Sequence, residues 1–202
     1  MARPRAGNYE DQRARILGAA AELFATHGYT ASSMNAVAHA CGMTKATLYH
    51  YFTDKQALLL EIAGGHVARL EELAALPTGA AGDAPEAKLR VLIRRFMEAY
   101  ADAQNAHRVL TEDVRFMDDG PRRTVTEGQR RVVRAFAQSI AACRPDLPAA
   151  RHIPLAMLLF GMINWTFTWL RPDGPLDHAQ VGEMVADLFL GGLPAVRAPD
   201  PA

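Results

Sequence analysis

Cysteine is scarce in this chain of 202 residues, and its two cysteines, Cys41 and Cys143, lie about a hundred positions apart. Such a pair provides neither a disulfide framework nor the close ligand spacing of a zinc site. The N-terminal segment carries positive charge, but no apolar run follows it, so we expect no secretory signal peptide. These absences favour a protein of the reducing cytoplasm.

An excess of charge of either sign is also missing, because Lys and Arg total 22 and so do Asp and Glu. Net charge alone therefore gives no indication of a nucleic-acid partner. Residues 1–55 differ slightly from the rest, since they carry six basic and four acidic side chains. This local excess is compatible with a DNA-binding segment.

The sequence lacks the motifs of common enzyme classes: a His-x-x-x-His pair, a Gly-x-Ser-x-Gly turn and a phosphate-binding loop. Two acidic pairs, Glu112-Asp113 and Asp118-Asp119, could hold a cation, but adjacent acids at helix ends are more often solvated or capping. We therefore expect no catalytic site, no metal and no cofactor. An enzyme is the less favoured alternative.

Alternating strand patterns are absent as well, and almost every apolar periodicity is helical. We predict an all-α fold of about nine helices: an N-terminal three-helix helix-turn-helix head and a larger C-terminal helical domain. The predicted helices cover residues 9–27, 33–40, 44–51, 54–76, 86–105, 107–117, 122–142, 149–170 and 177–190. We expect a DNA-binding domain over 9–55, an effector-binding and dimerisation domain over 56–193, and a disordered tail over 194–202.

One apolar run without charge, residues 153–170, spans 18 positions and is at the lower length limit for a membrane span. It contains Pro154, Gly161 and Asn164 among other non-aliphatic residues. A helix that is buried in the core or between subunits fits this composition better than a membrane helix. We therefore expect no membrane partner, with a span as the alternative.

The strongest functional signal is a pair of short helices joined by a tight turn at Gly42. Ser33 and Thr44 are suited to cap the two helices. In the second helix, Leu48 and Phe52 lie four residues apart and would face the core. The side chains that remain free to meet a DNA groove or its edges are those of Lys45, Ala46, Thr47, Tyr49 and His50.

Residues 13–62 resemble the DNA-binding head of the TetR (tetracycline repressor) family. The most specific elements are the Leu23-Phe24…Gly28-Tyr29 helix end, Val37-Ala38, Gly42-Met43, and Leu48-Tyr49-His50-Tyr51-Phe52 followed by Lys55. The resemblance implies that Ser33 and Thr44 cap helices and touch phosphates. It assigns base reading to Asn35, Lys45, Ala46 and Thr47, and backbone contacts to Tyr49, His50 and Lys55. Met34 departs from the family, which often has a polar phosphate contact at that position.

Simpler roles remain open for several of these residues. Ser33 could cap its helix without touching DNA. Tyr49 and Tyr51 could be packing aromatics, and His50 could be an ordinary solvated side chain.

The C-terminal half predicts a homodimer, because paired heads read two half-sites of an operator. The apolar helix and the final helix are the expected interface, and TetR-like proteins usually dimerise through their last two helices. The final helix has four apolar residues at helical spacing, Met184, Val185, Leu188 and Phe189. The alternatives are that both helices fill the monomer core, or that the protein is a tetramer.

An effector pocket is predicted in the same half, lined by aromatic and sulfur-containing side chains with a polar anchor. The candidate ligand-binding residues are Phe96, Tyr100, Arg115, Phe116, Met162, Trp165 and Trp169. Ordinary core packing is the alternative for each of them. The segment from Asn164-Trp165 to Arg171-Pro172-Asp173-Gly174-Pro175 resembles TetR-like regulators of fatty-acid, sterol and aromatic-acid breakdown, several of which respond to CoA thioesters. Arginines that could meet CoA phosphates occur as the pairs 94–95, 122–123 and 130–131.

Together these observations predict a transcriptional repressor that binds a palindromic operator in double-stranded DNA as a dimer. A small-molecule effector, such as an acyl-CoA or aryl-CoA thioester, would release it by favouring a second conformation. The alternatives are a DNA-binding regulator without an effector and a regulator that activates transcription.

Overall fold

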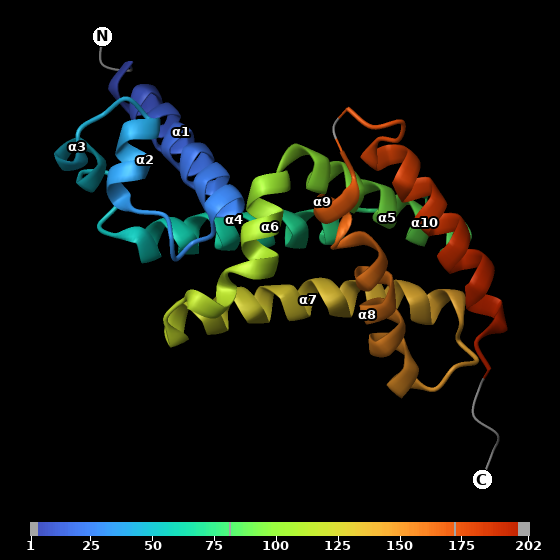
Figure 1. The fold of residues 1–202 in the computed structure, drawn as a ribbon. Helices are drawn as coiled ribbons and strands as arrows, with labels where there is room; N and C mark the ends of the chain where they lie inside the picture. The colour runs from blue at the N-terminus through green and yellow to red at the C-terminus, as the bar shows by residue number, and fades with distance from the viewer. Residues whose placement is uncertain (1–3, 81, 172, 198–202) are drawn as a thin grey trace. The chain divides into compact units, whose positions relative to one another are not determined.

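The computed structural model describes residues 4–80, 82–171 and 173–197, and over these ranges the chain forms helices and no strand (Figure 1). The described elements are ten α-helices and three short 3-10 helices, which confirms the predicted all-α class. None of the helices in these ranges combines the length and apolar character that a membrane span requires.

The chain divides into two compact units. The first unit joins the chain up to Val67 with Gln104–Thr126, and the second joins Ala68–Ala103 with the chain from Glu127 onward. The first contains α1 (Pro4–His27), α2 (Met34–Ala40), α3 (Lys45–Tyr49), most of α4 (Lys55–Ala75), α6 (Gln104–Glu112), η1 (Val114–Phe116) and the start of α7 (Asp119–Cys143). The second contains the remainder of α4 and α7 with α5 (Pro85–Asp102), η2 (Ala149–Arg151), α8 (His152–Ile163), α9 (Thr166–Trp169), α10 (His178–Gly192) and η3 (Leu193–Ala195).

The core of the first unit forms where α1 packs against α2 and α6. Helix α1 ends at Gly28, whose φ of 83° is the left-handed conformation that glycine adopts without strain. Helix α4 begins after Asp54, whose carboxylate accepts a hydrogen bond of 2.8 Å from the backbone N–H of Ala57. The largest buried side chains of this unit are Ile16, Phe24, Leu48, Leu58 and Leu59.

The core of the second unit is an aromatic cluster flanked by the packing of α10 against α5. The rings of Phe96 and Phe136 meet edge to face at 4.7 Å, and those of Phe136 and Phe160 at 4.8 Å. Gly182 of α10 lies where an added Cβ would be 3.2 Å from the Cγ atom of Met97, so these helices approach closely.

The predicted helix over 149–170 is wrong as a single element, because α8 ends at Ile163 and α9 begins at Thr166. Trp165, between them, has φ −91° and ψ 7°. Two hydroxyls satisfy carbonyls at the break: Thr166 donates to Ile163 O at 2.9 Å, and Thr168 donates to Trp165 O at 2.6 Å. Periodicity alone does not detect such a break, since the apolar pattern continues across it.

Several further boundaries differ from the prediction, and α1 and α7 begin earlier than predicted, at Pro4 and Asp119. The predicted helix over 107–117 is α6, ending at Glu112, followed by η1. Helix α10 continues through Gly192, and η3 extends helical structure to Ala195, two residues into the segment for which the sequence predicted disorder. Residues 198–202 of that segment lie outside the described residues, as does Pro172 of the predicted Arg171–Pro175 turn.

Candidate DNA-binding site and candidate effector residues

The predicted helix-turn-helix is formed by α2, the four residues 41–44 and α3. Ser33 accepts a hydrogen bond of 3.1 Å from the Ala36 N–H, and Thr44 accepts one of 3.1 Å from the Thr47 N–H. Gly42 has a φ of 64°, and the Met43 N–H donates to Ala38 O at 3.0 Å. Both predicted caps and the predicted glycine turn are therefore confirmed.

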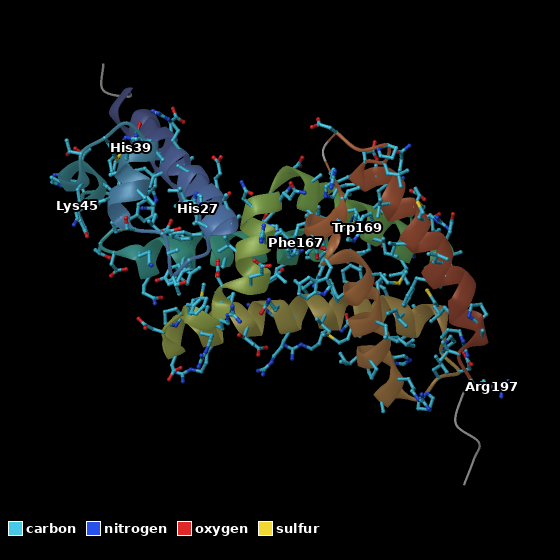
Figure 2. The ribbon with its side chains drawn as sticks, viewed as in Figure 1. His27, His39, Lys45, Phe167, Trp169 and Arg197 are labelled. Carbon is cyan, nitrogen blue, oxygen red and sulfur yellow. The ribbon has the colours of Figure 1, made fainter. Side chains whose placement is uncertain are left out.

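Burial on one side of α3 leaves the other side open. Leu48 is fully buried and Phe52 nearly so, while Val37 and Ala38 of α2 are buried beside the turn. The five side chains in and just after α3 that were predicted to face DNA are exposed, namely Lys45, Ala46, Thr47, Tyr49 and His50 (Figure 2 labels Lys45). The Lys45 ammonium lies 5.8 Å from the centre of the Tyr49 ring, so charge and aromatic surface share this face.

The remaining predicted contacts of α2 have different surroundings. Asn35 is exposed on α2, and Ser33 is exposed at its N-terminal end. Met34 is buried, with 8% of its surface accessible. The departure from the family at this position therefore supplies packing to the core and offers no polar group to a phosphate.

Lys55 makes contacts that the sequence did not predict. Its ammonium donates to Tyr29 O at 2.8 Å and to Ser32 O at 2.9 Å, and lies 4.2 Å from the centre of the Tyr29 ring. These contacts bind the start of α4 to the turn between α1 and α2. The phosphate contact of Lys55 stays a prediction, but its charge already has partners within the protein.

Arg13 contacts two residues that lie just beyond α3, Tyr51 and Phe52, and the sequence did not predict this. Its guanidinium pairs with the Glu61 carboxylate, donates to Tyr51 O at 3.4 Å and lies 4.6 Å from the centre of the Phe52 ring. Tyr51 also stacks on Tyr9 with 4.9 Å between ring centres. Tyr51 accordingly packs within the protein, as considered for it from the sequence.

Two predicted effector residues, Phe96 and Tyr100, are buried together in the second unit. Their rings meet edge to face at 6.1 Å, and the Tyr100 hydroxyl donates to Asn164 Oδ1 at 2.9 Å. Burial raises the pKa of Tyr100 well above its ordinary value, so the phenol keeps its proton at neutral pH. Met162 of α8 is half-buried.

The predicted tryptophans are exposed, in contrast to the buried cluster. Trp165 and Trp169 each keep about half of their surface accessible, at 51% and 53% (Figure 2 labels Trp169). They continue a four-residue repeat of exposed positions along α8 and α9, and α10 exposes apolar residues as well. We call this set the apolar stripe: Ile153, Met157, Leu158, Trp165, Trp169, Met184 and Leu188.

The two other predicted effector residues, Arg115 and Phe116, belong to the first unit. Phe116 stacks on Tyr29 with 5.8 Å between ring centres and an interplanar angle of 19°. The Arg115 guanidinium is exposed and lies 4.8 Å from the centre of the Phe116 ring. The structure thus brings Phe116 to the turn that precedes α2.

Most of the arginines predicted for CoA phosphates already have partners. Arg94 lies within ion-pair distance of Glu98 and Glu183. Arg131 donates from Nε and Nη2 to the two carboxylate oxygens of Glu71, at 2.7 and 3.0 Å. Arg95 donates to Leu76 O at 3.1 Å, beyond the end of α4. To bind a phosphate, these arginines would first have to give up the carboxylate or carbonyl partners that they have in the protein.

A buried histidine pair in the first unit was also missed by the sequence. His66 Nε2 and His107 Nδ1 are 3.3 Å apart, and the two residues keep 5% and 3% of their surface accessible. Burial lowers the pKa of His66 to about 4, so His66 is neutral at pH 7. No group of three metal-ligating side chains occurs among the described residues.

Comparison with known families gives two matches that follow one another along the chain. Residues 16–62 match the family described as "Bacterial regulatory proteins, tetR family". Residues 82–193 match "Tetracyclin repressor-like, C-terminal domain".

Individual relatives agree with these matches. The transcriptional repressor KstR2 of Mycobacterium tuberculosis is 24% identical over 203 residues, which covers 93% of this chain and 96% of the relative. A TetR-family transcriptional regulator from Bordetella parapertussis has a similar structure, with a TM-score of 0.84 and 30% identity over 92% of this chain and 97% of the other. AibR, solved in complex with isovaleryl coenzyme A and operator DNA, has a TM-score of 0.74 and 23% identity over 88% and 97% of the two chains.

Proposed function

Because the chain belongs to the TetR family of transcriptional regulators, we propose that it is a repressor that binds a palindromic operator as a homodimer and releases it when a CoA thioester binds its C-terminal domain. The relatives named above are regulators, as the sequence predicted, and the chain is not an enzyme. The proposed site of action is the cytoplasm, where the bacterial operator is found.

The exposed face of α3 carries this proposal. Leu48 is completely buried, and this fixes the orientation of the second helix of the helix-turn-helix. The side chains of Lys45, Thr47 and Tyr49 are therefore exposed to solvent. Lys45 can donate to a guanine edge or a phosphate, and Thr47 and Tyr49 can donate to base edges or phosphate oxygens. Ser33 and Thr44 already bind backbone amides, so their additional contact with phosphates is the less direct part of the proposal.

Dimerisation is proposed through α8, α9 and α10, on which the apolar stripe lies. Leu158 and Leu188 keep 65% and 67% of their surface accessible, which is costly for aliphatic side chains in water. Helices α8 and α10 pack against each other within the protomer. A second copy of the chain would cover both helices and place two heads on two half-sites.

The effector proposal concerns the interior of the second unit. The buried Tyr100 hydroxyl and the half-buried Asn164 amide form a polar pair beside the aromatic cluster, and this pair could hydrogen-bond the carbonyl of an acyl or aryl thioester. A thioester is the favoured class because AibR was solved with isovaleryl coenzyme A and because the C-terminal segment resembles regulators of acid and sterol breakdown. Release requires only that the thioester bind the low-affinity conformation more tightly by a few kcal/mol.

Fluorescence anisotropy tests the central proposal. The protein is titrated into a labelled duplex that carries the palindrome nearest its own gene, with and without a panel of acyl-CoA and aryl-CoA esters. We expect nanomolar binding that weakens with salt, and release by one ester but not by free CoA. Tight binding that every ester leaves unchanged would refute the effector class, and failure to bind any DNA would refute the repressor.

Analytical ultracentrifugation tests the interface. Leu188→Glu should convert the dimer to a monomer, because a carboxylate would be desolvated in the interface. Leu76→Glu is the matched control, since Leu76 is also half exposed but lies outside the stripe. Equal sedimentation of the Leu188 variant and the wild type would rule out this surface.

A further inference from the structure

The turn from Tyr29 to Ser32 determines where α2 begins, because Ser33, the next residue, is the α2 N-cap. Its conformation is held on one side by α4, through the Lys55 ammonium on Tyr29 O and Ser32 O. Ser32 is buried, and its hydroxyl donates to Gly28 O at 2.9 Å. Any displacement of this turn would therefore be transmitted to the helix-turn-helix.

The segment around η1 also contacts this turn. Phe116 stacks on the Tyr29 ring at 5.8 Å, and the Phe116 carbonyl accepts a hydrogen bond of 2.8 Å from Gln56 Nε2 at the start of α4. Asp113 keeps only 6% of its surface accessible. Burial raises the pKa of its carboxyl, and the Tyr29 backbone N–H opposes this by donating to the carboxylate.

The segment around η1 belongs to one family domain by sequence and to the other compact unit by packing. Asp113 and Phe116 lie within residues 82–193, the part that matches the C-terminal family domain. They nevertheless pack in the same compact unit as the helix-turn-helix. The segment is thus a part of the C-terminal domain that is fixed to the DNA-binding head.

We propose that Asp113 and Phe116 are positioning residues for DNA binding, because they hold the turn that sets the start of α2. The inference rests on the proposed function, because it requires that α3 bind an operator. It also gives Phe116 a different role from the effector contact expected from the sequence. The Phe116–Tyr29 ring stack and the contact of the buried Asp113 carboxylate with the Tyr29 amide are either made or broken. The turn before α2 is therefore expected to have two discrete positions and not a continuous range of positions.

Phe116→Ala provides the first test. We expect the affinity for a selected operator duplex to fall on the order of tenfold, with no change in the affinity for a random duplex. Non-specific binding depends on total charge, whereas specific binding depends on the placement of α2 and α3. Phe136→Leu is the control, because it shrinks the aromatic cluster of the second unit and lowers stability without touching the turn.

Both variants are measured at a temperature at which circular dichroism shows them to be folded. Operator affinity reduced by Phe116→Ala and unchanged by Phe136→Leu supports a positioning role. Equal losses in the two variants, or no loss in either, would overturn it.

Hydrogen exchange on the wild-type protein provides a second test that does not depend on a variant. The Phe116 and Met117 amides donate hydrogen bonds to Asp113 O and Val114 O. If the contact of η1 with the turn before α2 is coupled to DNA binding, operator DNA must change the hydrogen-exchange rates of these two amides. Protection over residues 44–50 reports binding itself. Protection there with unchanged exchange at 116–117 would refute the coupling while leaving the repressor intact. No protection at either place would refute both.

Discussion

Substitution of Lys55 by methionine separates two roles for this residue, one inside the protein and one on DNA. The ammonium donates two hydrogen bonds to carbonyls of the turn before α2, at 2.8 and 2.9 Å, and lies over the Tyr29 ring. Methionine keeps the length of the side chain but provides neither the charge nor the donors. The carbonyls of Tyr29 and Ser32 would then lose a partner.

The expected loss of stability follows from these contacts. Hydrogen bonds from a charged donor contribute roughly 1.5–3 kcal/mol each when buried. Lys55 is half-buried, so solvent reduces this value, and we expect Lys55→Met to lower the free energy of unfolding by about 2 kcal/mol in total. For a chain of this length the midpoint of thermal unfolding should fall by about 6 °C.

The assay combines urea unfolding with the salt dependence of DNA binding. Lys45→Met is the matched control, because Lys45 is exposed on α3 and its ammonium lies 5.8 Å from the Tyr49 ring. It should leave stability within about 0.5 kcal/mol and reduce the slope of log affinity against log salt by about one. If Lys55→Met leaves stability unchanged and instead reduces the salt slope, the internal role assigned to Lys55 is wrong.

Three further changes test other parts of the structure. Gly182→Val should lower the free energy of unfolding by about 2 kcal/mol, because even its Cβ would lie 3.2 Å from Met97 Cγ; an unchanged thermal midpoint would show that α5 and α10 pack less closely. Thr44→Ala should cost about 1 kcal/mol in urea and weaken operator binding, since the Thr47 N–H loses its acceptor, whereas Thr44→Ser should restore both. Burial lowers the folded-state pKa of His66 to about 4, below its value of roughly 6.5 in the unfolded chain, so the unfolded state binds more protons between these values. Stability should therefore fall by up to about 3 kcal/mol as pH drops from about 6.5 to 4, and a His66→Gln variant whose urea midpoint shows the same pH dependence as the wild type would contradict this origin.

Features that depend on near neighbours were predictable from the sequence. The caps at Ser33 and Thr44 each bind an amide three residues ahead, and the turn at Gly42 needs only the conformational freedom of that residue. The inward direction of Leu48 follows from helical periodicity. These local rules placed the exposed face of α3, from which the DNA-binding role is argued.

Features that depend on distant partners appeared only in the folded chain. Periodicity shows that Phe116 has an apolar environment, but it does not show that this environment is Tyr29, far away in the sequence. In the same way, a lysine at the start of a helix predicts a surface charge, whereas the Lys55 ammonium binds carbonyls of the turn before α2.

The aromatic residues of the C-terminal half show the same division. The sequence predicted both Phe96 and Trp169 as residues of an apolar pocket. In the structure Phe96 is fully buried, whereas Trp169 is half exposed. The spacing of apolar, capping and glycine residues along the sequence predicted that this chain is helical, carries a helix-turn-helix and has apolar surface to cover. The tertiary structure decided which aromatic side chains the protomer buries itself and which it leaves exposed, because burial depends on how whole helices pack and not on the residue alone.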